Sequence, residues 1–432
     1  MAGALQFATS LYLRRFTDAY NRTVWRDPMA QLRGRAGRDD PYPIYERVRS
    51  IGSVVPTRLG SFISPSHPVC NFVLRDRRFG VRSGERVQTS DEFDMSFLDM
   101  DPPDHTRLRR LAQPFFSPKL MAGYRPRVVA QVDSLLDAAA AKGSFDLVSS
   151  FAAPLPIAVI TDLLGVPDAD AAQFSSVGTV IGSALSGIRS LSHAARLRAA
   201  NETLTELFGD LFELRRVSPA DDVISHLVAA PSAQIQPSEL RPMCTLLLVA
   251  GFETTVNLIG NAVNALLAHP AQWRDLCDDP AALAGPAIEE TLRWDPPVQR
   301  TARCALEDLD VDGVPVKRGQ YVITMLAAAN RDPAVFSRAG TFDIHRTLQA
   351  DHLAFSSGIH YCVGAPLARM EATIGLQRLA ERMPGLARAG TLRRRTSGIV
   401  RGPIHFPVRA DGPAATAAAG RRVAPGGRPL AG

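Results

Sequence analysis

The feature that most constrains this chain is a segment from residue 239 to 268 that contains no strong helix breaker after Pro242. As one helix it would be roughly 45 Å long at about 1.5 Å per residue, which is enough to cross a whole domain. Its centre, Leu246-Leu-Leu-Val-Ala-Gly-Phe, is apolar on every face. A helix of that kind has to be covered by protein on all sides. The segment therefore predicts a large domain built around one buried helix.

Three polar residues interrupt this apolar helix directly after its centre. They are Glu253, Thr254 and Thr255. Burying a carboxylate and two hydroxyls costs several kcal/mol unless they are hydrogen-bonded or have a function. Two readings stay open from this segment alone, namely a solvated kink between two half-helices and a functional group placed inside the protein.

The patterns around the long helix define the fold class. Helical periodicity dominates from about residue 105 to 295, while short alternating segments at 53–63, at 308–323 and around 399–408 predict three hairpins. The second hairpin should turn at Asp312-Gly313. Because helices are many and strands few, we expect a mainly α fold with small β-sheets. No internal repeat or linker-like stretch occurs before residue 410, which favours one large domain over residues 39–410.

The charge of the chain lies mostly at its ends. The net charge of the 432 residues is +6, but the body from 39 to 410 has a net charge of −1. Residues 1–38 carry seven arginines against two aspartates, and we treat them as a basic amino segment. We expect no nucleic-acid groove. At most, Arg14, Arg15 and their neighbours would contact an anionic membrane surface. Residues 411–432 are poor in large apolar side chains, which predicts a disordered tail.

The cysteines and the amino end indicate the compartment. The five cysteines, at 70, 244, 277, 304 and 362, form no CxxC pair or regular framework, which is typical of reduced thiols in a cytosol. The first residues have their charges after an interrupted apolar stretch, unlike a signal peptide. We therefore expect a soluble cytoplasmic protein, and a monomer.

One cysteine lies in a distinctive loop. Cys362 is bracketed by Gly358 and Gly364, immediately before a helical pattern that starts near Ala365. Both glycines are able to adopt backbone conformations that other residues avoid. A position at a helix amino end should lower the pKa of the thiol. Because a single cysteine is most often a small core residue, the pattern of the whole loop carries more weight than the thiol.

That loop resembles the haem-binding loop of the cytochrome P450 family. The matching pattern is Phe355-x-x-Gly358-x-His360-x-Cys362-x-Gly364. Further P450 motifs follow the family's order over about residues 40–410. They are the groove at Ala250-Gly-Phe-Glu-Thr-Thr255, the Glu-x-x-Arg motif at Glu290-Thr-Leu-Arg293 and the segment Phe342–Arg346. The resemblance implies the P450 fold, with haem b buried between the long central helix and the loop and helix that bear the cysteine.

The resemblance also implies the residues that hold the haem. Cys362, as thiolate, would be the axial iron ligand, with Phe355 close to the sulfur and Gly364 in the same loop. Because buried carboxylates need cationic partners, the two haem propionates should be bound by His105, Arg109, Arg303 and His360. A Glu-Arg-Arg network of Glu290, Arg293 and Arg346 should have a structural role.

On the oxygen side, the resemblance implies a proton-delivery system. Ala250 and Gly251 would let dioxygen approach the helix, Thr254 would hydrogen-bond it during activation, and Glu253 would supply protons through water. Glu253 and Thr254 are thus the catalytic residues. Peroxide-using members of the family typically lack this acid and threonine. The pair therefore implies an oxygen-dependent monooxygenase that receives two electrons from outside.

The electron donor and the substrate complete the expectations. The chain has no GxGxxG fingerprint for a dinucleotide, so electrons should come from a ferredoxin and its NAD(P)H-dependent reductase. The substrate should be a hydrophobic small molecule, such as a lipid, terpenoid, steroid or polyketide, that is hydroxylated or epoxidised. Alternatives are a P450-fold enzyme with peroxide-using, isomerase or dehydratase chemistry, and a haem-binding sensor. Apolar residues expected to line the substrate pocket are Phe93, Phe97, Ile181, Val298 and Ile399.

Overall fold

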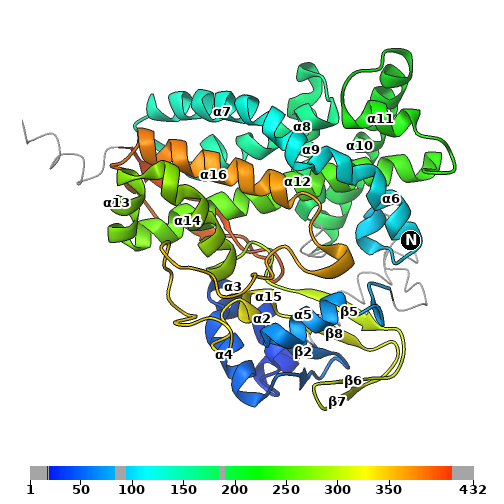
Figure 1. Ribbon diagram of the computed structural model, residues 1–432, viewed down its shortest axis with the longest axis vertical. Helices are drawn as coiled ribbons and strands as arrows, with labels where there is room; N and C mark the ends of the chain where they lie inside the picture. The colour runs from blue at the N-terminus through cyan, green and yellow to red at the C-terminus, as the bar shows by residue number, and fades with distance from the viewer. Residues whose placement is uncertain (1–16, 18, 83–93, 184–189, 411–432) are drawn as a thin grey trace, which may run out of the picture.

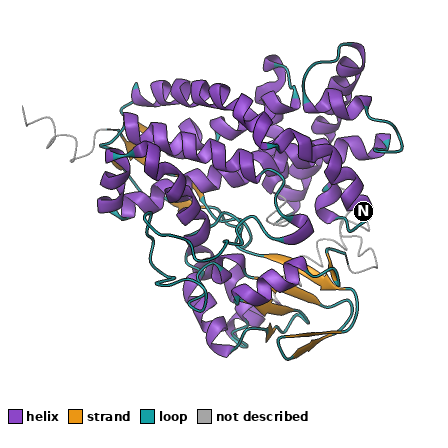
Figure 2. Ribbon diagram, in the orientation of Figure 1, coloured by secondary structure: helices purple, strands orange, loops and turns teal. Residues whose placement is uncertain are grey.

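A computed structural model of the chain describes residues 17, 19–82, 94–183 and 190–410. Helices fill the larger part of the molecule, and the main sheet lies in a smaller part beside it (Figure 1 and Figure 2). This agrees with the predicted mainly α fold with small β-sheets. The predictions for Arg14, Arg15, Phe93 and the tail from 411 lie outside the described residues.

The predicted long helix is α12 (Pro237–Ala268), which runs through the middle of the helical part (Figure 1). It begins two residues earlier than predicted, because Gln236 and Glu239 form a capping box at its start. By length and composition the helix could cross a membrane, but 83% of its most apolar window is buried inside the protein. It is the core helix of the domain.

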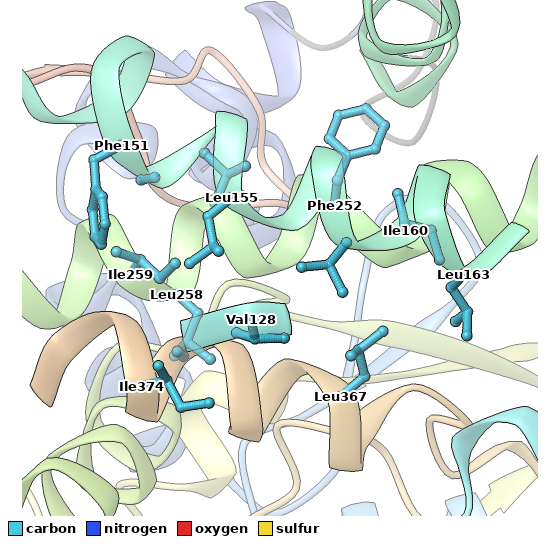
Figure 3. Close-up of a cluster of buried hydrophobic side chains, with 14 of the residues drawn as sticks. Val128, Phe151, Leu155, Ile160, Leu163, Phe252, Leu258, Ile259, Leu367 and Ile374 are labelled. Carbon is cyan, nitrogen blue, oxygen red and sulfur yellow. The ribbon is translucent and has the colours of Figure 1, made fainter. Parts of the chain in front are cut away.

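The other helices pack around α12. Figure 3 shows the core where side chains of α12 meet those of α8 (Pro154–Leu164) and α16 (Ala365–Arg382). Small residues allow the helices to approach closely: a Cβ at Gly251 would lie 2.9 Å from the side chain of Ile160. The further helices are α2 (Pro28–Arg33), α3 (Arg35–Asp39), α4 (Tyr42–Ile51), α5 (His67–Arg75), α6 (Asp104–Ala112), α7 (Pro118–Ala140), α9 (Asp168–Gly182), α10 (Leu191–Val217), α11 (Val223–Ala229), α13 (Pro270–Asp278), α14 (Pro280–Trp294) and α15 (Leu326–Ala329).

The amino-terminal helices belong to the folded body. Met29 and Leu32 of α2 are buried in a cluster with Tyr45 and Val48 of α4. Residues 28–38, which the charge distribution assigns to the basic amino segment, therefore contribute to a hydrophobic core. Charge counting missed this packing because the arginines of the segment alternate with the apolar residues that face inward.

The main sheet has five strands in the order β1-β2-β8-β5-β3. The first predicted hairpin is confirmed, since β1 (Val55–Pro56) pairs antiparallel with β2 (Phe62–Ser64). The second is confirmed as β6 (Leu309–Val311) and β7 (Val314–Val316), with positive φ angles at Asp312 and Gly313. The remaining strands of the main sheet are β3 (Phe79–Gly80), β5 (Thr301–Ala305) and β8 (Tyr321–Thr324).

The third predicted hairpin, around residues 399–408, is wrong. Both strands exist, but β11 (Pro403–His405) pairs with β10 (Arg393–Arg394). The following strand, β12 (Pro407–Arg409), pairs with β4 (Ser144–Asp146) and β9 (Ala387–Arg388). The chain thus passes from one small sheet to another at the buried Phe406. Alternation along a sequence reports that a strand exists, but not which strand it joins.

Candidate functional site

A short strip of α12 is open although the helix around it is buried. Ala250 is exposed, and Gly251 and Thr254 are half-buried, whereas the residues from Met243 to Val249 and from Thr255 to Val263 are buried. On the neighbouring element, the thiol-bearing Cys362 is exposed just before α16. The helices α12 and α16 pack against each other, so the open strip and the cysteine that precedes α16 lie on neighbouring elements. The sequence predicts these residues as the two faces of a haem site.

The backbone of the cysteine loop is fixed by one glycine. Gly358 has a φ of 70°, and a Cβ there would lie 2.4 Å from the carbonyl oxygen of Leu74. The loop closes through the backbone N–H of Cys362, which donates to the carbonyl of Phe355 at 2.9 Å. Gly364 has an ordinary φ of −83°, so of the two glycines only Gly358 adopts a conformation that other residues avoid.

The electrostatics of the thiol differ from the prediction. Although Cys362 has exposed surface, desolvation by the protein that surrounds it raises the pKa of its thiol, and this outweighs the opposing effects of the Gly364 N–H and the Arg109 guanidinium. The predicted lowering of the pKa by the helix end is therefore wrong, because removal of the sulfur from water counts for more than the helix dipole. A coordinated metal ion deprotonates such a thiol outright. Binding of the haem iron would therefore be needed to obtain the thiolate, which the protein surroundings alone disfavour.

The four predicted propionate ligands lie together. The imidazole rings of His105 and His360 are 4.3 Å apart, and Arg109, from the same face of α6 as His105, donates to the carbonyl of Tyr361. Among the described residues, neither ring nitrogen of His105 has a hydrogen-bond partner, and the same is true of Nε2 of His360. Arg303 is 5% exposed, and its Nη1 donates to the carbonyl of Ala302 at 2.9 Å.

Burial and positive charge make this cluster a site for anions. Burial and the nearby Arg303 lower the pKa of His360 to about 3, and burial lowers the pKa of Arg303 to about 10. The nearby carboxylate of Asp101 already accepts the backbone N–H of Val81 at 2.9 Å. Buried cations without counter-ions are costly. The two carboxylates of a haem would satisfy them, so the residues present fit this cofactor.

The two predicted catalytic residues point in different directions. Thr254, at the open strip, donates its hydroxyl to the carbonyl of Ala250 at 3.1 Å. Glu253 is 2% exposed, and its Oε1 lies 2.8 Å from Nη1 of Arg395. A Cβ at Gly182 would be 2.7 Å from the other carboxylate oxygen. Glu253 therefore lies between the end of α9 and the residue that follows β10, Arg395, which is its ionic partner.

Sequence reasoning missed two residues of this region. One is Arg395, which lies in a run of three arginines and is distinguished only by its tertiary contact. The other is Glu371 of α16, whose carboxyl group is 1% exposed beside Thr255 and whose pKa burial raises well above its usual value. Glu371 follows Leu367 by four residues and precedes Gly375 by four, on the buried face of α16. An acid on an apolar helix face was a signal that could have identified it.

The predicted Glu-Arg-Arg residues are in contact. Nη2 of Arg293 lies 2.7 Å from Oε1 of Glu290, and Nε of Arg346 lies 3.3 Å from the same oxygen. Arg293 is completely buried and also donates to the carbonyls of Asn330 and Ala339, at 3.0 and 2.7 Å. The network therefore ties α14 to the long loop that leads to the cysteine.

The predicted substrate-lining residues fall into separate places. The ring of Phe97 packs edge-on against His105, with a centroid distance of 6.4 Å. Val298 forms an isolated bridge with Val400, next to Ile399, which is 37% exposed. Ile181 is 1% exposed and belongs to the main core. Contact of these side chains with a substrate stays a prediction.

Comparisons with known proteins agree with this geometry. The family model for cytochrome P450 matches residues 283–382. A putative cytochrome P450 140 of Mycobacterium tuberculosis is 38% identical over 391 residues, covering 85% of this chain and 89% of the relative. The cytochrome P450 monooxygenase PikC of Streptomyces venezuelae is 40% identical over 382 residues, covering 84% and 89% of the two chains.

Solved structures give the same result for the fold. P450BioI, in complex with an acyl carrier protein ligated to hexadec-9Z-enoic acid, has a TM-score of 0.81 at 34% identity, covering 86% of this chain and 98% of that chain. CYP164A2 of Mycobacterium smegmatis has a TM-score of 0.81 at 36% identity, covering 88% and 99%. The chain therefore belongs to the cytochrome P450 family and is a haem-dependent monooxygenase.

Proposed function

We propose that the protein uses a haem b held by Cys362 to hydroxylate or epoxidise a hydrophobic small molecule. The observation that carries this proposal is the open strip of α12 and the exposed cysteine before the neighbouring helix α16, together with the cluster of two arginines and two histidines whose imidazole nitrogens lack partners among the described residues. His105, Arg109, Arg303 and His360 would bind the propionates. The bound haem supplies the oxidising chemistry, with the thiolate as electron donor to the iron.

Side chains of this protein deliver the protons that the reaction consumes. In a monooxygenation, one substrate and one dioxygen molecule take up two electrons and two protons and give the oxygenated product and one water. Thr254, at the open strip, positions a hydroxyl where dioxygen reacts. Glu253 supplies protons from the buried side of the helix, and Arg395 keeps that carboxylate in place. General acid catalysis of this kind contributes about 10²–10⁴-fold to a rate.

Electrons would come from a ferredoxin and its NAD(P)H-dependent reductase. Exposed arginines near the cysteine loop favour an acidic electron donor. They are Arg75, Arg77 and Arg110. Gly358 of the cysteine loop touches the end of α5 at Leu74 and Arg75. A cationic surface beside the cysteine would steer an acidic donor to it.

The substrate class is hydrophobic, as the predicted lining residues Phe97, Val298 and Ile399 indicate. Structural relatives support a long-chain or bulky compound: P450BioI was solved with an acyl carrier protein bearing a hexadecenoic acid, and a myxobacterial CYP267B1 with myristic acid. The five free cysteines support a cytoplasmic location. Lipids, terpenoids, steroids and polyketides are the candidate classes.

The decisive experiment compares the reduced, CO-treated haem protein with its Cys362→His variant. We expect the red-shifted Soret band of a thiolate-ligated haem in the wild type and its loss in the variant. Turnover should require ferredoxin, reductase and dioxygen. Equal turnover with peroxide alone, or product formation without any electron donor, would instead support the peroxide-using or isomerase alternatives. Ligand binding without product would support a sensor.

A further inference from the structure

A solvent-open pocket outside the haem site has an unusual concentration of arginines. Its enclosed part is small, about 10 Å³, and most of the 290 Å³ around it is a mouth open to solvent; it lies between the amino-terminal helices and the carboxyl-terminal strands. Four arginines line it, while Tyr45, Gln299 and Ser397 contribute hydroxyl and amide groups. The lining arginines are Arg38, Arg394, Arg395 and Arg401.

A fifth arginine lies buried against the wall of this pocket. Arg300 is 8% exposed, and its Nη2 is 2.9 Å from the position that a Cβ on Gly398 would occupy. Gly398 lines the pocket, so the lack of a side chain there leaves room for the guanidinium group. Nη1 of Arg300 is buried and has no hydrogen-bond partner among the described residues.

Only part of this positive charge is neutralised by the described chain. Arg401 is paired with Asp295 at 2.8 Å, and Arg395 with Glu253 at 2.8 Å. No ion pair with a described carboxylate reaches Arg300 or Arg394, and Nη1 of Arg394 is also buried without a hydrogen-bond partner. Burial lowers the pKa of both groups, and Arg401 adds to this at Arg394. An arginine nevertheless stays charged in a protein, and an unpaired buried charge is costly.

We propose that these five arginines form a binding site for an oxyanion, namely a phosphate or a carboxylate group. We call it the arginine pocket (Arg38, Arg300, Arg394, Arg395 and Arg401). Guanidinium groups match both kinds of oxyanion through paired N–H donors. An oxyanion here would supply a counter-charge close to the buried Arg300 and a hydrogen-bond acceptor for Arg394, which lines the pocket.

The place of the arginine pocket defines where the oxyanion can come from. The backbone N–H of Gln299, which lines the pocket, donates to the carbonyl of Ile399 at 2.8 Å. Val298 and Ile399, the neighbours of these lining residues, are predicted to face the substrate. The oxyanion is therefore either a free ion or the charged end group of a mostly apolar substrate that contacts Val298 and Ile399.

Thermal unfolding of the haem-loaded protein tests the site without reference to its activity. Sodium phosphate should raise the Tm of the wild type by about 2 °C more than sodium chloride of equal ionic strength, when phosphate is present at about tenfold its Kd. Arg300→Gln should remove this difference. Arg393→Gln is the matched control, because Arg393 is exposed on the same strand as Arg394 and should keep the difference. If Arg300→Gln does not fold, Arg394→Gln replaces it.

Two results would overturn the proposal: no phosphate-specific rise in the wild type, or an equal loss of the rise in the Arg393→Gln control. The source of the oxyanion is read from Soret titrations with laurate and with dodecanol. If the oxyanion is a substrate end group, Arg300→Gln weakens laurate binding about tenfold and leaves dodecanol binding unchanged. If it is a free ion, neither affinity changes while the phosphate response of Tm is still lost.

Discussion

The carboxylate of Glu253 and the guanidinium of Arg395 form an ion pair at 2.8 Å between the central helix and the carboxyl-terminal strands. The two residues are 142 positions apart in the sequence. Because Glu253 is 2% exposed, removal of Arg395 leaves a buried carboxylate with less compensation. Breaking a buried pair from one side typically costs about 3–5 kcal/mol.

This pair makes a prediction for a double-mutant cycle. Arg395→Gln should destabilise the haem protein by about 3 kcal/mol, and adding Glu253→Gln should restore most of that loss because the unpaired charge is gone. Coupling of electron use to product should fall in both single variants and no further in the double variant. Additive losses of coupling would show that Arg395 does not act through Glu253. Arg393→Gln serves as the control.

The hydroxyl of Thr254 provides a second prediction. Thr254→Ala should leave haem binding intact but divert most electrons to peroxide or water, with an expected fall in coupled product of about tenfold or more. Thr254→Ser, which keeps the hydroxyl, should retain most of the coupling. Product and peroxide are measured per NAD(P)H consumed in the reconstituted system. Unchanged coupling in the alanine variant would mean that Thr254 has no part in proton delivery.

The cationic cluster predicts how firmly the haem is held. Arg303→Gln removes a buried charge that would bind a propionate, and a charged hydrogen bond is worth about 1.5–3 kcal/mol. Haem loss to an excess of apomyoglobin should accelerate at least about tenfold. Arg110→Gln, on the exposed face of the nearby helix α6, should show the wild-type rate. Equal rates of haem loss in the wild type and both variants would show that Arg303 does not bind a haem propionate.

Glu371 predicts a pH dependence of stability. Burial raises its pKa in the folded protein above the usual value of 4.5, so the folded state binds a proton that the unfolded state releases. This group therefore favours folding most below pH 4.5, and its contribution declines as the pH rises through 4.5 toward the folded pKa. Glu371→Gln should gain stability over the wild type on going from pH 5 to pH 7.5. Urea unfolding of the haem protein measures this.

The exposed Glu206 of α10 is the matched control for that measurement. Glu206→Gln should change stability equally at both pH values, since this side chain is exposed to solvent in the folded protein. If Glu371→Gln also shows a constant difference from the wild type, the carboxyl group is ionised in the folded protein, in conflict with its buried position.

The sequence allowed prediction of features that are coded locally. The buried helix α12 follows from an apolar run, and the cysteine loop from a pattern of spaced residues within ten positions. The tertiary contacts were not predictable in this way. Arg395 has the same local context as Arg393 and Arg394, and only the packing of β10 and β11 near α12 distinguishes it. The strands of residues 403–409 likewise found distant partners, because pairing depends on tertiary arrangement and not on alternation.

The close contact between Gly182 and Glu253 has a consequence for the order of events in turnover. Gly182 ends α9, and the preceding residue, Ile181, is predicted to face the substrate. A substrate that displaces Ile181 would also change the space above the carboxylate, since a single Cβ at Gly182 would already collide with it. If Ile181 contacts the substrate and Glu253 delivers protons, as predicted, the arrival of the substrate and the release of protons would be linked through two adjacent residues of α9. Electrons would then be consumed mainly when a substrate is bound.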